Sequence, residues 1–253
     1  MDVLRSLPKA ELESLAQRVG ATIDRNKRVD GPVQLARVLV TMPEVRDMAL
    51  LGPAPAQLLR RLGEAGGVLV VRAVPPALEP LAARGLVFAR VHDNGLYELV
   101  LPSAYLVQLP TWEGEDPRGM RSLLAQASAE TQSAIASHYA GRPATHPVAL
   151  ALEDAWDLLS NRDAIAREVE GLSSAEKRLL ESIYEEGGEV DTEELLDLER
   201  EPLRLRSATG ATPSRRGVGF SLERRGMLIP VHPNRHIVPT EVAAVIGAED
   251  VSS

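Results

Sequence analysis

The 253-residue sequence contains no cysteine, so disulfide bonds and thiolate metal ligands are excluded. A chain without cysteine fits a reducing compartment, and we expect a cytoplasmic protein. Aromatic residues make up only 3% of the chain, so its core must be built from Leu, Val, Ile and Ala. This composition favours helices with short strands over a β-sandwich.

Long apolar segments are also missing. The longest apolar run, residues 68–74, is interrupted by Arg72 and is far too short to cross a bilayer. The N-terminus has no basic segment followed by an apolar stretch, so it does not resemble a signal peptide. We therefore expect no membrane association.

The usual signatures of catalysis and of cofactor binding are absent as well. The segment Gly217-Val218-Gly219 has Leu222 where a dinucleotide fingerprint needs its third glycine, and no P-loop pattern occurs. His232 and His236 flank a Pro-Asn turn with no carboxylate or cysteine beside them, which indicates a surface turn and not a metal pair. The sequence predicts no enzyme, no cofactor and no metal site.

What the chain does contain is an internal repeat. Residues 51–67 and 172–188, 121 positions apart, are identical at seven of 17 positions, and both segments end in a pair of glycines. Gly20 and Gly141 follow the same offset at the end of a helical pattern. Further on, residues 85–88 match residues 226–229 at an offset of 141, so the second copy carries about 20 extra residues around 198–217.

The repeat predicts a mainly α protein with short β-hairpins, an α+β chain that is a tandem duplication of a helical segment plus a winged helix. The first copy is expected at 1–109, with its helical segment at 1–50 and its winged-helix-like part at 51–109. Residues 110–119, which are rich in Pro, Gly and acidic residues, are predicted to be a linker. The second copy is expected at 120–253, with its helical segment at 120–171, its winged-helix-like part at 172–247 and a short acidic tail.

Apolar spacing and capping residues locate the individual elements. Helices are predicted at 8–19, 32–41, 53–65, 75–84, 121–140, 148–160, 173–186, 191–199 and 212–225. Ser173 and Glu176 have the spacing of a capping box. A strand is predicted at 68–71, and hairpins at 86–101, around Asn94-Gly95, and at 227–242, where residues 237–242 form the second strand.

This pattern resembles the helicase-associated winged-helix repeats found near the N-terminus of bacterial XPB-like helicase proteins. The residues that carry the resemblance are the helix ends Leu81-Ala82-Ala83-Arg84-Gly85-Leu86-Val87 and Leu222-Glu223-Arg224-Arg225-Gly226-Met227-Leu228-Ile229. The helicase motor is absent, since the sequence has no P-loop. The resemblance implies an accessory role in binding DNA or a partner, without ATPase activity.

Basic charge is concentrated in residues 200–225, which contain seven arginines and two glutamates, while the whole chain has a net charge of −8. A winged helix presents the N-terminal half of its third helix to the major groove. The candidate nucleic-acid-binding residues are therefore in the second copy, with Arg235 in its hairpin: Arg204, Arg206, Arg215, Arg216, Arg224, Arg225 and Arg235.

Two functions remain open at this point. The first is a non-enzymatic DNA-binding accessory or regulator of transcription or repair that contacts double-stranded DNA through the second copy. The alternative is an acidic protein-interaction adaptor that does not bind DNA, in which the arginines neutralise the ten acidic residues of 176–199. The net negative charge favours the adaptor, and the local arginine density favours DNA.

Overall fold

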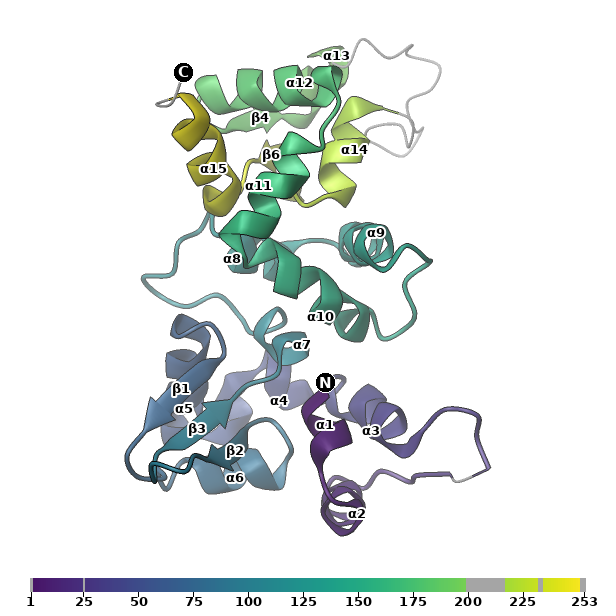
Figure 1. Cartoon of the computed structure of the whole chain (residues 1–253), viewed down its shortest axis with the longest axis vertical. Coiled ribbons are helices and arrows are strands. Elements are labelled where there is room, and N and C mark those ends of the chain that lie inside the picture. Colours follow the sequence, from purple (N-terminus) through teal and green to yellow (C-terminus); the bar gives the residue numbers. More distant parts are fainter. Residues whose placement is uncertain (1, 25, 199–216, 232–233, 251–253) are drawn as a thin grey trace. The chain divides into compact units, whose positions relative to one another are not determined.

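A computed structural model describes residues 2–24, 26–198, 217–231 and 234–250 (Figure 1). The chain is mainly helical, with 56% of its residues in helices, and has two small antiparallel sheets of three strands each. The predicted α+β class is confirmed at this level. None of the described helices combines the length and the apolar character needed to cross a bilayer.

The chain forms two compact units. The first unit comprises residues 1–115 and 145–153, and the second comprises residues 116–144 and 154–253. Residue 116 lies inside the stretch that was predicted as the linker. Trp112, in the same stretch, packs against Gly63, where an added Cβ would lie 2.7 Å from the indole ring, so this residue belongs to the core of the first unit.

Helices make up most of the first unit, with three strands near its end. In chain order its elements are α1 (Asp2–Ser6), α2 (Lys9–Arg18), α3 (Gly31–Leu39), α4 (Pro43–Arg46), the 3-10 helix η1 (Met48–Leu51), α5 (Pro53–Glu64), β1 (Val68–Val71), α6 (Leu78–Ala83), β2 (Phe88–Val91), β3 (Tyr97–Val100) and α7 (Ser103–Leu106). Asp30 caps α3 by accepting the backbone N–H of Val33 at 3.0 Å. The prolines in the first turn of α5 fit a position where backbone N–H groups have no intrahelical acceptor.

The sheet of the first unit has the strand order β1-β3-β2, with both neighbouring pairs antiparallel. Val100 of β3 lies opposite Val68 of β1 on one side and opposite Phe88 of β2 on the other. The turn between β2 and β3 contains Asn94, whose side chain accepts the N–H of Leu96, and Gly95 with a φ of 77°. The predicted Asn-Gly hairpin is thus present.

The second unit repeats this alternation with longer helices. Its elements are α8 (Met120–Gln126), α9 (Ala129–Ala140), α10 (Val148–Leu159), whose first part belongs to the first unit, α11 (Arg162–Glu170), α12 (Ser174–Glu185), β4 (Glu189–Asp191), α13 (Thr192–Leu198), α14 (Val218–Arg224), β5 (Ile229–Val231), β6 (Arg235–Ile237) and α15 (Thr240–Asp250). The predicted capping box at the start of α12 is confirmed, because Ser173 and Glu176 each accept the other's backbone N–H.

Three element boundaries differ from the prediction. The single helix expected at 121–140 is two helices, because Ser128 caps α9 by accepting the N–H of Thr131. The strand expected at 237–242 ends at Ile237, and the chain then forms α15, whose Val242, Val245 and Ile246 are buried along one helical face. The helix start predicted at residues 212–213 lies outside the described residues, and α14 begins at Val218, after Gly217.

Apart from α13, which has no counterpart in the first unit, both units have the same order of elements around their sheets. Helices α5 and α12 begin and end 121 positions apart, and the second sheet has the strand order β4-β6-β5, the counterpart of β1-β3-β2. Leu101 donates its N–H to the carbonyl of Gly67, as Val238 does to Gly188. Each unit also has a left-handed glycine two residues after the helix that precedes its hairpin: Gly85 after α6 and Gly226 after α14.

At Gly226, as at its counterpart Gly85, both backbone conformation and packing favour glycine. The φ of Gly226 is +70°, and an added Cβ would lie 3.1 Å from a methyl carbon of Leu159, a side chain that is 1% exposed. Gly141 has a similar φ of +62° but no neighbouring atom within 4 Å.

We therefore expect Gly226→Ala to lower the free energy of unfolding by about 2–4 kcal/mol, from backbone strain plus overpacking, and Gly141→Ala by about 1 kcal/mol from strain alone. Urea unfolding followed by circular dichroism measures both variants. Equal losses in the two would show that Leu159 does not restrict this site.

Candidate functional site

Helix α14, which precedes the hairpin of the second unit, is the element on which the nucleic-acid prediction depends. It packs against both α9 and α12. Gly219, Leu222 and Glu223 are buried, and Arg224 is exposed. One side of this helix therefore packs against the protein, while Val218, Phe220 and Ser221 are half-buried.

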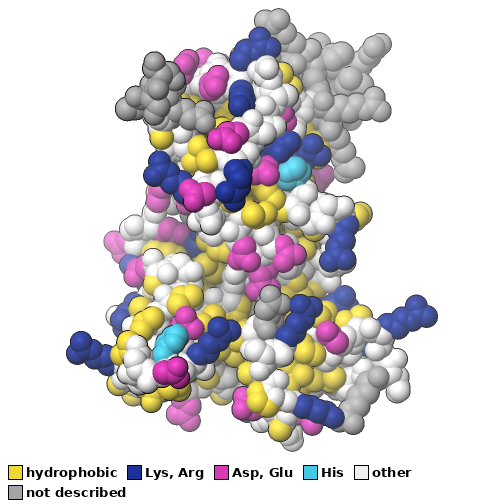
Figure 2. Space-filling model, viewed as in Figure 1, with side chains coloured by type: hydrophobic (Ala, Val, Ile, Leu, Met, Phe, Trp, Pro, Cys, Tyr) yellow, Lys and Arg dark blue, Asp and Glu magenta, His cyan; other side chains and the backbone are white. Residues whose placement is uncertain are grey.

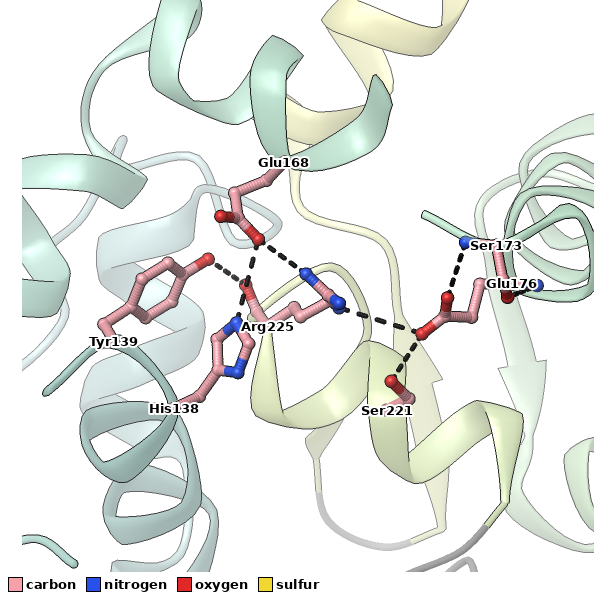
Figure 3. Close-up of polar contacts among 7 residues, drawn as sticks. All are labelled: His138, Tyr139, Glu168, Ser173, Glu176, Ser221 and Arg225. Carbon is pink, nitrogen blue, oxygen red and sulfur yellow. Dashed lines mark hydrogen bonds and ion pairs between the residues drawn. The ribbon is translucent and has the colours of Figure 1, made fainter. Parts of the chain in front are cut away.

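A network of ion pairs and hydrogen bonds connects α14 with α9, α11 and α12 (Figure 3). Arg225, directly after α14, pairs with Glu168 of α11 through Nη1 and Oε2 at 2.8 Å. Its Nε also lies 3.7 Å from Oε1 of Glu176, on α12. Because the arginine side chain is only 19% exposed, these pairs are partly shielded from solvent.

Glu176 is the most highly coordinated carboxylate of this network. It accepts the backbone N–H of Ser173 at 2.7 Å and the hydroxyl of Ser221, a residue of α14. Burial acts to raise the pKa of Glu176, but the hydrogen bonds from Ser221 and Ser173 and the charge of Arg225 outweigh it and lower the pKa. The side chain is therefore a stable carboxylate that joins α12 to α14.

Two residues of α9 complete the network from the other side of α14. The Tyr139 hydroxyl donates to the backbone carbonyl of Arg225 at 2.7 Å, and burial raises the pKa of this phenol, so it keeps its proton. His138 lies with Nε2 3.7 Å from Oε2 of Glu168. Burial and the nearby Arg225 charge lower the pKa of His138, which keeps the ring neutral.

Chemically, this arrangement is suited to holding helices together. Its hydroxyls and its guanidinium donate to carboxylates or to a backbone carbonyl, and each of these contacts joins two different helices. Among the described residues, no group of three or more His, Cys, Asp or Glu side chains could hold a metal ion. The network lies on four helices that are distant in sequence, and no local spacing indicates it.

A second polar cluster surrounds His236, for which the predicted surface position is wrong, while His232 lies outside the described residues. The His236 ring is 1% exposed, with Nδ1 2.9 Å from the Thr192 hydroxyl and Nε2 2.6 Å from the Glu223 carboxylate. It connects β6 with the start of α13 and with α14. Thr192 is itself 3% exposed, so its hydroxyl is enclosed by protein and serves as a hydrogen-bonding partner.

The predicted nucleic-acid-binding arginines do not share one environment. Arg204, Arg206, Arg215 and Arg216 lie outside the described residues. Arg224 is exposed and forms no ion pair with any described carboxylate, whereas Arg225 belongs to the network above. Arg235 pairs with Glu189 across the β4-β6 pair. Two of the three described arginines are thus bound to carboxylates of the same unit.

The first unit uses a simpler version of the same contacts. Arg84, which follows α6 as Arg225 follows α14, lies 3.5 Å from Glu44 of α4. Arg18 of α2 donates to the backbone carbonyl of Ala83 at 3.2 Å, the counterpart of the Tyr139 contact. In both units a helix of the preceding segment, α2 or α9, is therefore hydrogen-bonded to the end of α6 or α14.

The first unit also has an open groove, which no motif in the sequence indicates. This groove has a volume of about 520 Å³ and lies between α1 and α2 on one side and α6 and β2 on the other. Its walls include apolar side chains such as Leu7, Leu15 and Phe88, together with Arg18 and Arg90. Among the described residues that line it, Glu11 is the one acidic side chain.

In comparisons with known proteins, the chain matches no protein-family model, no curated protein and no solved structure. The resemblance to helicase-associated winged-helix repeats therefore stays a prediction that depends on the residues quoted for it.

Neighbouring arginines allow a matched test of the network. We expect Arg225→Ala to lower the free energy of unfolding by about 1–2 kcal/mol, because it leaves Glu168 and Glu176 partly buried without their cation. Arg224→Ala removes the same charge from an exposed site and should change stability by less than about 0.5 kcal/mol. Chemical denaturation at low and high salt measures both, and equal effects would contradict the assigned role of Arg225.

Proposed function

We propose that the chain is a non-enzymatic adaptor whose two units each carry a winged-helix module, and that its partner is a protein. The carrying observation is that Arg225 and Arg235, two of the three described arginines predicted to bind DNA, are paired with carboxylates of their own unit, which leaves fewer cations free for phosphate. A cytoplasmic location is part of the proposal, since a chain without cysteine needs no oxidising compartment.

The winged-helix part of the proposal is supported by the order and pairing of the elements. Each module has a helix, a strand, a further helix (α6 or α14) and a two-stranded hairpin. In both modules the first strand pairs with the last. The second module has the additional helix α13 between its first strand and α14.

Electrostatics also favour a protein partner. The whole chain carries a net charge of −8, and duplex DNA is bound mainly by basic surfaces. Figure 2 shows basic and acidic side chains interspersed over the visible face, where a phosphate backbone would need a continuous basic patch. The pairing of Arg225 and Arg235 with carboxylates reduces the basic character of the second module further.

The groove of the first unit is the surface that fits a protein segment. It runs beside β2, an edge strand of the sheet. His92 donates its backbone N–H to the carbonyl of Leu96. Because residues that bond to the partner strand alternate with residues that do not, the N–H and C=O groups of Ala89 and Val91 point away from β3. An extended segment could pair with this edge, its apolar side chains in the groove and an acidic side chain near Arg18 and Arg90.

A displayed peptide library tests this directly. We expect the full-length protein to select peptides in which apolar residues alternate with polar ones and include an acid. Ala89→Glu, which places a carboxylate on the exposed groove-lining position, should reduce retention of those peptides at least about tenfold.

Ala175→Glu is the matched control for this substitution, because Ala175 is also exposed but lies on α12 of the second unit. It should leave selection unchanged. Selection of no peptide, or of peptides retained equally by Ala89→Glu, would contradict the proposed groove.

DNA binding remains the second candidate, and one observation favours it. Arg224 is exposed at the end of α14 and is not neutralised by a described carboxylate, and four more predicted arginines lie in residues outside the described part. Phosphate contacts from such residues would make binding steeply dependent on salt.

Fluorescence anisotropy with a labelled duplex separates the two candidates. For the adaptor, we expect no binding of the full-length protein at physiological salt. If DNA is the partner, affinity falls linearly with salt on a logarithmic plot, and Arg224→Ala reduces that slope by about one while exposed Arg72→Ala leaves it unchanged.

A further inference from the structure

The opposite edge of the first unit's sheet, strand β1, has an exposed apolar surface that the proposed function does not use. Val68 and Val70 are 44% and 53% exposed, respectively, and both point to the same face because side chains alternate along a strand. We infer that β1 pairs with β1 of a second copy of this chain, antiparallel, to join the two sheets into one.

The backbone of β1 is available for such pairing. Strand β1 lies at the edge of the β1-β3-β2 sheet. Leu101 donates its N–H to the carbonyl of Gly67, and the antiparallel ladder alternates from there, so residues 69 and 71 bond to β3. The N–H and C=O groups of Val68 and Val70 consequently point away from the sheet.

Comparison with the second unit shows how unusual this edge is. At the offset of 121, the positions of Val68 and Val70 are occupied by Glu189 and Asp191 in β4, which is also an edge strand. Charged side chains on an edge strand prevent association with other strands. The second unit thus has a protected edge, and the first unit has β-branched apolar side chains at the same two places.

A second copy fits this edge better than an unrelated strand because the edge is self-complementary. Antiparallel pairing centred on Leu69 places Val68 opposite the partner's Val70, and Val70 opposite the partner's Val68. The four valines then form one apolar cluster on a single face. The same register places Arg72 opposite the partner's Gly66, so no like charges face each other.

The same pairing is unfavourable for the second unit. An equivalent register of β4 would place Glu189 opposite the partner's Asp191, two carboxylates directly across a strand pair. The difference between the two edges predicts a dimer joined through the first units alone. This inference does not depend on whether the groove beside β2 binds a peptide.

Sedimentation velocity over a range of concentrations tests the inference on the full-length chain. We expect the wild-type protein to show a concentration-dependent monomer–dimer equilibrium. Val68→Glu combined with Val70→Asp copies the charge pattern of β4, and it should raise the dissociation constant at least about tenfold. Val91→Asp, at the 70% exposed end of the other edge strand, is the matched control and should leave the dimer intact.

A charge-swap experiment distinguishes loss of pairing from loss of folding. Val68→Lys with Val70→Lys should also be monomeric, whereas its mixture with the acidic double variant should form a heterodimer, because lysines then lie opposite carboxylates. A wild-type chain that stays monomeric at the highest concentration overturns the inference. So does a dimer that survives the acidic double substitution, or a mixture of the two variants that does not associate.

Discussion

The ion pair between the arginine that follows α6 or α14 and a glutamate of the preceding helical segment is a contact that both units share. In the second unit Arg225 contacts Glu168, and in the first unit Arg84 approaches Glu44. Because these arginines directly precede the left-handed glycines, the contact fixes the point where the chain leaves the helix for the hairpin. Helical segment and sheet are thereby held as one body in each unit.

Around this shared contact the two units differ mainly in polarity. The second unit places Glu176 and Ser221 in hydrogen-bonding contact, where the matching positions of the first unit are Pro55 and Pro80. Buried polar groups have few alternative partners, so they select one arrangement of helices more strictly than apolar contacts do. At these two positions the second unit therefore has a directional contact that the first unit lacks, although the first unit has its own buried hydrogen bond, from the Tyr105 hydroxyl to the carbonyl of Gly85.

The sequence predicts those elements whose ends carry a local signal. Pro53 and Ser173 mark helix starts, and Asn94-Gly95 marks a hairpin, because each residue stabilises its own backbone conformation. Helix α15 was missed because Val238 and Val242 suggest a strand locally, while its helical face is formed by contact with α11. The buried His236 was missed because Thr192 and Glu223, distant in sequence, enclose it. Contacts of this kind depend on tertiary structure and leave no local pattern.

Residues 145–153 have a consequence for how the protein can be divided. The chain passes from the first unit to the second after residue 115, returns at residue 145, and leaves again after residue 153. A single cut anywhere between 116 and 144 would therefore remove part of the first unit along with the second. A continuous fragment that contains every residue of one unit therefore also contains residues of the other.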